Sequence, residues 1–321
     1  MAKKDRIKGV VISMPTPTKG KYEIDLPKLK DHITWVIDEG MREGKAVVMA
    51  AAGLGTGYFL TRDEQVSVMK ATVDAANGKV PTVTGIFDSC TKEAVIRAKE
   101  AQDIGIDYLQ MNTPHYQAPY ADEVFMHYEA VNDGSDCGII AYNTPWASMN
   151  FDITPPLLDR LIKLDNFVSL KWTANDPSNL LNTLKNYSKK VAIIDNSSQS
   201  SLAYYLGAKA YIPSFMAHLN PKTELYFSSL LESKQYERFD KERTEILTPF
   251  RSAVASVPEF NIPTAGEGTD SHAMFEVFGN PMGAPVLPQY HISKKSVDEL
   301  RTKLNKIGWA DKVKEVGKRK A

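Results

Sequence analysis

Residues 138–171 read GIIAYNTPWASMNFDITPPLLDRLIKLDNFVSLK, and this stretch contains one complete strand–helix–strand unit. Two short apolar runs, GIIAY at 138–142 and FVSLK at 167–171, are typical of buried strands. The segment PPLLDRLIKL between them has the apolar spacing of a helix. A strand, a helix and a second strand in this order predict two parallel strands joined by a crossover helix.

The same unit recurs along the whole chain. Six further apolar runs alternate with segments of helical periodicity, at 9–14, 46–51, 82–87, 108–111, 191–195 and 210–212. Capping signals mark several helix borders: Asp25, Thr61 with Glu64, and Ser200 as N-caps, and Gly40 and Gly105 as ends. Eight near-even units without a linker between halves predict an α/β fold, a (β/α)8 TIM barrel, rather than a doubly wound sheet.

More than 100 residues follow the eighth predicted strand. They contain three further helical patterns, PKTELYFSSLLESK, YERFDKERTEILTPFRSAVA and SVDELRTKLNKIG. We therefore expect a barrel over residues 1–225, followed by a C-terminal helical region over residues 226–321 that packs on it.

Composition excludes several classes of function. The 321 residues include 39 Lys and Arg against 39 Asp and Glu, and this balance gives no electrostatic footprint for nucleic acid or an anionic membrane. The two cysteines, Cys90 and Cys137, form no CxxC motif, which argues against a disulfide scaffold or a structural zinc site. The apolar run 10–14 is too short for a signal peptide, and no run approaches a membrane span. We expect a cytoplasmic protein without a cofactor.

Lys171 is the unusual residue of the first stretch. A lysine at a strand end is most simply a solvated residue. In a TIM barrel, however, active sites lie at the C-terminal ends of the strands, where Lys171 and, one strand earlier, Tyr142 both stand. A desolvated lysine loses its proton easily, and the neutral amine can attack a carbonyl to form an imine. A nearby phenol could then transfer protons, although Tyr142 could equally cap the core.

Two other segments are expected at the same mouth. In AAGLGTGYFLTRDE, residues 51–64, the glycines do not form a dinucleotide loop, because Tyr58 replaces the third glycine of GxGxxG. This segment is either a plain tight turn or a turn whose N–H groups approach an anionic ligand. The loop NTPHYQAPY, residues 112–120, carries His115, Tyr116 and Tyr120, which either pack the loop or bring one hydroxyl to an active site.

Several of these motifs, in their order and spacing, resemble the dihydrodipicolinate synthase and N-acetylneuraminate lyase family of Schiff-base aldolases and dehydratases. The resemblance covers almost the whole chain. It rests on GVVISMPTPTKGKYEIDLPKLKDHITWVIDEG at the start, AAGLGTGYFLTRDE, NTPHYQAP, AYNTP, VSLKW and GAKAYIPSFMAHLNP.

The resemblance implies a set of functional residues. Lys171 would form the imine, Tyr142 would transfer protons, and Tyr116 would reach into the active site of a neighbouring subunit. The remaining positions of these motifs would contact the substrate: Gly53, Leu54, Gly55, Thr56, Trp146 and Ile212. Members of this family are commonly homotetramers, built as dimers of dimers, and we expect the same here.

Two departures from the family pattern bear on the substrate. The paired threonines that hold a pyruvate-like carboxylate align with Gly53 and Leu54, and the glutamate of that loop aligns with Thr56. The arginine that grips the second substrate of dihydrodipicolinate synthases is absent near Ala147. The Ala/Gly-rich loop followed by aromatic residues, AAAGLGTGYFLT, resembles that of some sugar-acid dehydratases in this superfamily, and we expect a 2-keto acid of sugar-acid type. With Trp146 and Trp172 both expected near the mouth, a larger or more apolar carbonyl substrate is also plausible.

Ser197, Ser198 and Gln199 could bond sugar hydroxyls, although a serine there could equally cap the next helix.

Three other hypotheses stay open at this level. One is condensation of pyruvate with an aldehyde, as in dihydrodipicolinate synthase. Another is a barrel that has lost catalysis and binds a metabolite or serves as an assembly scaffold. A metal-dependent aldolase would need histidines and carboxylates at the strand ends, where the sequence offers Asp195 and Asp88 without a nearby histidine, so we expect no metal.

Overall fold

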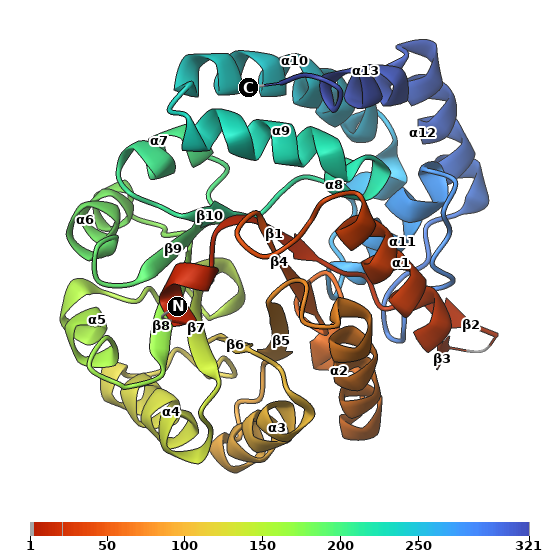
Figure 1. The fold of residues 1–321 in the computed structure, drawn as a ribbon. Helices are drawn as coiled ribbons and strands as arrows, with labels where there is room; N and C mark the ends of the chain where they lie inside the picture. Colours follow the sequence, from red (N-terminus) through yellow and green to blue (C-terminus); the bar gives the residue numbers. More distant parts are fainter. Residues whose placement is uncertain (1–2, 21, 321) are drawn as a thin grey trace.

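The computed structural model describes residues 3–20 and 22–320, and in it eight parallel strands close into a barrel (Figure 1). Around the barrel, neighbouring strands follow one another in the order β1-β10-β9-β8-β7-β6-β5-β4, and β4 pairs with β1 to close it. The strands are β1 (Gly9–Ser13), β4 (Ala46–Ala50), β5 (Thr82–Ile86), β6 (Tyr108–Met111), β7 (Gly138–Asn143), β8 (Phe167–Trp172), β9 (Ala192–Asp195) and β10 (Ala210–Tyr211). A two-stranded hairpin, β2 (Thr18–Lys19) and β3 (Glu23–Ile24), follows β1. The predicted (β/α)8 barrel is confirmed.

A ring of helices surrounds the strands (Figure 1). They are α1 (Leu26–Asp38), α2 (Arg62–Ala76), α3 (Thr91–Ile104), α4 (Ala121–Gly134), α5 (Pro155–Leu161), α6 (Pro177–Tyr187), α7 (Ser200–Tyr205) and α9 (Pro221–Glu232). The predicted caps hold at Asp25, which accepts from the Lys28 N–H, and at Thr61, where the capping box with Glu64 is complete. The predicted cap at Ser200 is wrong: the helix begins at Ser200, and its hydroxyl donates to Asp195 instead.

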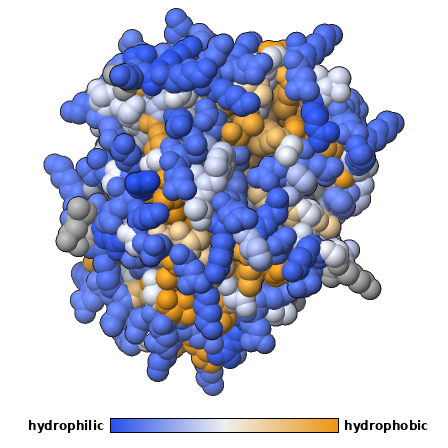
Figure 2. All heavy atoms as spheres, turned by 45° about the vertical axis from the view of Figure 1, so that its right-hand side comes forward, coloured by the Kyte–Doolittle hydropathy of each residue, from blue (hydrophilic) through white to orange (hydrophobic). Residues whose placement is uncertain are grey.

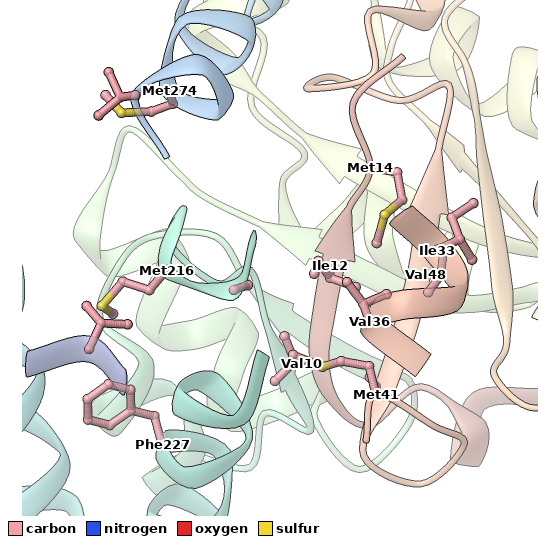
Figure 3. Packing of buried hydrophobic residues seen from close by; sticks show 14 of the residues in the cluster. Val10, Ile12, Met14, Ile33, Val36, Met41, Val48, Met216, Phe227 and Met274 are labelled. Atoms are coloured by element: carbon pink, nitrogen blue, oxygen red, sulfur yellow. The ribbon is translucent and has the colours of Figure 1, made fainter. Parts of the chain in front are cut away.

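The hydrophobic core has three parts. Inside the barrel, Val11, Val47, Val83 and Ile140 pack with Tyr108, and none of them is more than 1% exposed. A second cluster fills the space between β5–β9 and their outer helices. The third joins β1 and α1 to the C-terminal helices, and Figure 3 shows Val10 and Ile12 of β1, with Met14 just after it, in this cluster. One face of the molecule is mainly hydrophilic, with apolar side chains gathered in its hollows (Figure 2).

The C-terminal helices cover one side of the barrel (Figure 1). They are α8 (Met216–Leu219), α10 (Tyr236–Ala255), α11 (Gly268–Val277), α12 (Lys294–Lys306) and α13 (Trp309–Val316). The indole of Trp309 stacks between Phe250, at 4.6 Å between centroids, and Phe278, at 5.7 Å. The sequence pattern at 236–255 predicted α10 correctly, whereas α11 and α13 were not predicted.

The predicted border between residues 225 and 226 falls inside α9, and the division into two regions stays a proposal. In the part of the chain that the structure describes, no helix combines the length and the apolar character needed to cross a membrane.

Candidate active site

The pairing of β7 with β8 brings Tyr142 and Lys171 side by side. These two residues are direct partners in the parallel ladder. The pairing shifts between Ile139 and Ile140, so that Ile139 faces Phe167 and Ile140 faces Ser169. Beyond this irregularity Tyr142 pairs with Lys171, and both side chains line the same cavity at the barrel mouth.

Lys171 is a buried amine with an unusual environment. Its side chain is 5% exposed, and its Nζ atom lies 3.7 Å from the centroid of the Tyr142 ring. Burial lowers the pKa of Lys171 from 10.5 to about 8, and the charge of Glu267 opposes this shift. At pH 7 about a tenth of the amine is therefore neutral, far more than for an unperturbed lysine, and the neutral form is the one that nucleophilic attack requires.

Tyr142 keeps its proton. Burial raises the pKa of its phenol well above the usual range, and the neighbouring carboxyl of Glu267 adds to this effect. The amide of Asn196, just after β9, donates a hydrogen bond of 3.3 Å to the Tyr142 hydroxyl oxygen. Tyr142 is therefore a neutral phenol that can donate its own proton toward a substrate.

A cavity of about 360 Å³ opens beside these residues. Barrel-mouth residues form one wall, and helix α10 contributes Leu247, Phe250 and Arg251 to the other. The remaining lining includes Ser13, Met49, Leu54, Trp146, Asn196, Ile212, Ser214, His218 and Glu267. An adjoining cavity of about 540 Å³ shares Tyr142, Trp146 and Glu267 with the first and extends past Gly53 to His115.

The loop after β4 supplies part of both cavities. Leu54 lines the cavity of Lys171, and Gly53 lines the adjoining one. Gly55 and Thr56 face inward instead: Gly55 packs against the backbone oxygen of Met14, and Thr56 is 1% exposed with φ 52°. Neither of these two lines the cavity of Lys171, so their predicted substrate contact stays a prediction.

The loop after β10 is held rigidly at the mouth. Ile212 lines the cavity, as the resemblance implied, and Ser214 lies two residues further on. The buried carboxylate of Glu224 in α9 accepts hydrogen bonds from the Ser214 N–H at 3.1 Å, the Ser214 hydroxyl at 2.9 Å and the Tyr211 hydroxyl at 2.8 Å. These bonds fix the loop from the helix behind it.

Trp146 and Tyr116 are both open to solvent in the single chain. Trp146 is 65% exposed and lines both cavities. Tyr116 is 89% exposed on the 112–120 loop and does not line the cavity of Lys171. A contribution of Tyr116 to a neighbouring subunit's site stays a prediction.

One expectation about the mouth needs correction. Trp172 is fully buried in the cluster outside the barrel, because the strand alternation turns it away from the side that Lys171 faces. Ser197 donates to Asp195 at 2.6 Å within the turn after β9. Ser197, Ser198 and Gln199 do not line the cavity of Lys171, and a contact with sugar hydroxyls stays a prediction.

Six polar residues that line the cavity were not among the predicted site residues: Ser13, Asn196, Ser214, His218, Arg251 and Glu267. Asn196 directly follows a predicted strand and could have been found by that position. Arg251 and Glu267 lie in the C-terminal region, where no residue had been assigned to the site. Among the residues that the structure describes, no cluster of three or more His, Cys, Asp and Glu side chains could hold a metal ion.

A buried lysine at a barrel strand end, beside a tyrosine, is the arrangement of the class I Schiff-base lyases. The model of the dihydrodipicolinate synthetase family matches residues 6–255. The chain belongs to this family, as its motifs indicated.

Individual relatives agree with this assignment. The chain is 30% identical over 168 residues to the 4-hydroxy-tetrahydrodipicolinate synthase of Psychrobacter sp. (strain PRwf-1), covering 52% of this chain and only 54% of that relative. The dihydrodipicolinate synthase of Acinetobacter baumannii complexed with pyruvate superposes with a TM-score of 0.76, 22% identity, and 94% and 99% coverage of the two chains. CdNal from Clostridium difficile in complex with mannosamine superposes with a TM-score of 0.78 at 17% identity, and the match covers 93% of this chain and 98% of that one. At such identities the two structures support the fold alone.

Proposed function

We propose that this protein is a class I lyase that acts on a 2-keto acid through an imine at Lys171. The observation that carries the proposal is the buried amine of Lys171, with its pKa lowered to about 8, facing Tyr142 inside an open cavity. A buried titratable group of this kind at a barrel mouth is a candidate nucleophile on physical grounds.

The chemistry follows from these two side chains. The neutral amine of Lys171 adds to the substrate carbonyl, and loss of water from the resulting carbinolamine leaves a protonated imine. The Tyr142 phenol, which keeps its proton, donates to the departing oxygen. The protonated imine then takes up the electron pair released when a neighbouring bond breaks, whether that is an aldol carbon–carbon bond or the carbon–hydrogen bond broken before dehydration.

The charged side chains that line the cavity favour a ligand with a carboxylate group. Arg251 and Lys171 are its cationic side chains, against the single carboxyl of Glu267. In the described chain, the guanidinium of Arg251 makes no ion pair and no side-chain hydrogen bond, so it is available to a carboxylate. It lies on α10, away from the segment after Tyr142 where the family arginine is missing.

We propose a keto acid of sugar-acid type, on the basis of the hydrogen-bonding groups beside Lys171. Ser13, Ser214 and Asn196 line the same cavity and could bond hydroxyls of a polyhydroxy chain. The apolar wall of Leu54, Phe250 and their neighbours is the reason to include aromatic keto acids in the test.

Pyruvate, as held by the Acinetobacter baumannii structure, is the simplest 2-keto acid and a suitable first probe. Condensation of pyruvate with an aldehyde stays the second candidate, favoured by relatives called 4-hydroxy-tetrahydrodipicolinate synthase. A homotetramer and a cytoplasmic location are part of the same proposal.

Borohydride trapping tests the proposed function. The protein is incubated with pyruvate, with a panel of 2-keto-3-deoxy sugar acids and with aromatic 2-keto acids, and then reduced. Intact mass and peptide mapping should find one adduct, on Lys171, and the compound that labels fastest indicates the substrate class.

The matched controls are two lysine-to-arginine variants. Lys171→Arg should lose the adduct completely. Lys190→Arg should keep it, because Lys190 also lies over a tyrosine ring, 4.7 Å from the Tyr187 centroid, but is exposed and does not line the cavity. If no carbonyl compound labels Lys171 in the unmodified protein, the proposal is wrong and a metabolite-binding barrel becomes the better hypothesis.

A further inference from the structure

The carboxyl group of Glu267 enters the barrel mouth from the C-terminal region. It lines both the cavity of Lys171 and the adjoining one. A Cβ atom placed on Gly53 would lie 2.8 and 2.9 Å from the two carboxyl oxygens, so the carboxyl group rests directly over this glycine. The space that a side chain at position 53 would fill is therefore taken by Glu267.

The backbone around Glu267 is anchored on both sides. Its N–H donates to the Tyr58 hydroxyl oxygen at 3.0 Å, and the N–H of Gly268 donates to the side-chain oxygen of Gln289 at 2.8 Å. Gly266 and Gly268 leave no room for side chains: added Cβ atoms would approach Tyr58 and Gln289 to 2.4 Å. The fold thus holds this residue at a defined place while leaving its carboxyl group free.

That carboxyl group has no partner in the protein. Within residues 3–20 and 22–320 it accepts no hydrogen bond and joins no ion pair. Its side chain is open to the cavity, yet the surrounding protein raises its pKa, and the charge of Lys171 opposes the rise. An unpaired carboxyl group on an anchored backbone, beside a nucleophilic amine, is available to a ligand.

The other groups of the cavity are poor bases. Tyr142 keeps its proton, and Arg251 is a permanent cation. The ring of His218 is tied to His32 at 3.0 Å, and burial lowers its pKa well below the ordinary value. Glu267 is the one carboxylate among the described residues that line the cavity of Lys171.

We propose that the carboxylate of Glu267 removes and returns the proton on the carbon next to the imine carbon. This inference rests on the proposed imine at Lys171. As the carboxylate takes the proton, the carbon–hydrogen electron pair becomes the carbon–carbon double bond of an enamine. The electron pair of the carbon–nitrogen double bond moves onto nitrogen, and Glu267 becomes a neutral acid. Return of the proton reverses each change.

Charge coupling between the two groups favours this step. The protonated imine is a fixed positive charge that holds Glu267 in its ionised, proton-accepting form. When the proton is transferred, the imine charge and the carboxylate charge disappear together, so no isolated charge is left in the cavity. Both aldol cleavage and dehydration pass through this enamine, so the role does not depend on which reaction the enzyme performs.

The test uses pyruvate in heavy water, because its methyl protons exchange through the same enamine. Proton NMR should show that the unmodified protein replaces the methyl protons by deuterium. Glu267→Gln, which keeps the shape of the side chain, should slow this exchange about 100-fold or more. Borohydride with pyruvate should still label Lys171 in the variant, because imine formation does not need the carboxylate.

Two further variants sharpen the result. Glu276→Gln removes a carboxylate from α11, the helix that follows Glu267, at a position outside the cavity lining, and should exchange pyruvate like the unmodified protein. Glu267→Asp retains a carboxylate one methylene further back and should keep part of the activity.

An exchange rate in Glu267→Gln within about threefold of the unmodified protein, with labelling intact, would overturn the inference alone. Labelling without any exchange in the unmodified protein would contradict it as well. Absence of labelling in the unmodified protein would instead remove the proposed function, and the inference with it.

Discussion

The backbone N–H of Glu267 donates a hydrogen bond of 3.0 Å to the hydroxyl oxygen of Tyr58, a residue 209 positions earlier in the chain. Tyr58 follows the glycine loop after β4, and its ring packs edge-on against Phe59 and Phe87. The bond therefore joins the C-terminal region to the barrel mouth at the cavity that Lys171 lines.

Removing this hydroxyl should loosen the segment of Glu267. In Tyr58→Phe the ring can keep its aromatic contacts, but the Glu267 N–H loses its acceptor, and we expect a loss of about 1 kcal/mol of unfolding free energy. Pyruvate exchange should slow several-fold while borohydride labelling persists. Tyr290→Phe is the control, since Tyr290 also tethers the C-terminal region, to Glu259, but lies on the surface. Equal exchange rates in the two variants would argue against a positioning role for Tyr58.

Because Lys171 is buried, the free energy of unfolding should depend on pH in the alkaline range. The amine has a folded pKa of about 8 against 10.5 for an unperturbed lysine, so between these values the unfolded state binds more protons and stability rises with pH. The penalty is present in full below about pH 8, where it amounts to about 3 kcal/mol.

Lys171→Met removes that penalty. The variant should be more stable than the unmodified protein at pH 7, and the difference should shrink as pH rises from about 8 to about 10.5. Urea unfolding of both proteins at several pH values measures this. A difference that is constant across the window would contradict the lowered pKa.

Two glycines of the loop after β4 should respond very differently to alanine. A Cβ on Gly57 would lie 1.8 Å from the backbone oxygen of Ala51, which cannot move without breaking the turn. We expect Gly57→Ala to lose more than about 2 kcal/mol of stability. On Gly53 the three atoms nearest to the added Cβ all belong to the carboxyl group of Glu267, at the end of a flexible side chain. Gly53→Ala should fold with nearly unchanged melting temperature, but should slow pyruvate exchange by displacing that carboxyl group.

Arg251 offers a test of acid recognition. Arg251→Gln keeps polarity and much of the length but removes the guanidinium charge from the cavity wall. We expect KM for 2-keto acid substrates to rise at least about tenfold, which corresponds to about 1.4 kcal/mol of binding free energy. The value of kcat should change much less, because the group does not take part in bond breaking. Arg238→Gln, on the same helix and paired with Glu242, is the control. A fall in kcat at constant KM would contradict a binding role.

The barrel was predictable because its signals are local. Apolar residues recur along each strand and helix with the spacing typical of that element, and the capping box of Thr61 and Glu64 marks a helix start within four residues. The direct pairing of Tyr142 with Lys171 follows once two neighbouring strand ends are known. This part of the candidate site is a consequence of the fold itself.

The rest of the candidate site depends on contacts that no local pattern encodes. Glu267 reaches the mouth through a loop, and the only signal in the sequence is the Gly-Glu-Gly triplet at 266–268, which permits close packing on both sides. Arg251 lies in α10, a helix that the apolar spacing of its sequence predicted. The orientation of this helix over the barrel mouth depends on contacts with residues distant in the sequence. Trp172 was misplaced because neighbours in a strand point to opposite sides.

The role of the Tyr142 hydroxyl group can be tested separately from that of its aromatic ring. Tyr142→Phe keeps the aromatic face that lies 3.7 Å from the Lys171 amine, so the lysine should stay in place and keep its lowered pKa. It removes the proton donor, and turnover of a keto acid should fall by about 10² to 10⁴. Borohydride labelling at saturating pyruvate should still reach completion, but more slowly, because loss of water from the carbinolamine is unassisted.

Asn196→Ala provides the comparison for Tyr142→Phe. It removes the amide that donates to the Tyr142 oxygen at 3.3 Å and leaves the phenol itself. We expect a loss of turnover at least tenfold smaller than in Tyr142→Phe, because the proton donor is only less well oriented. Rapid-quench measurement of the labelling rate distinguishes the two cases. If Tyr142→Phe labels as fast as the unmodified protein and only turnover falls, the phenol acts after imine formation and not during it.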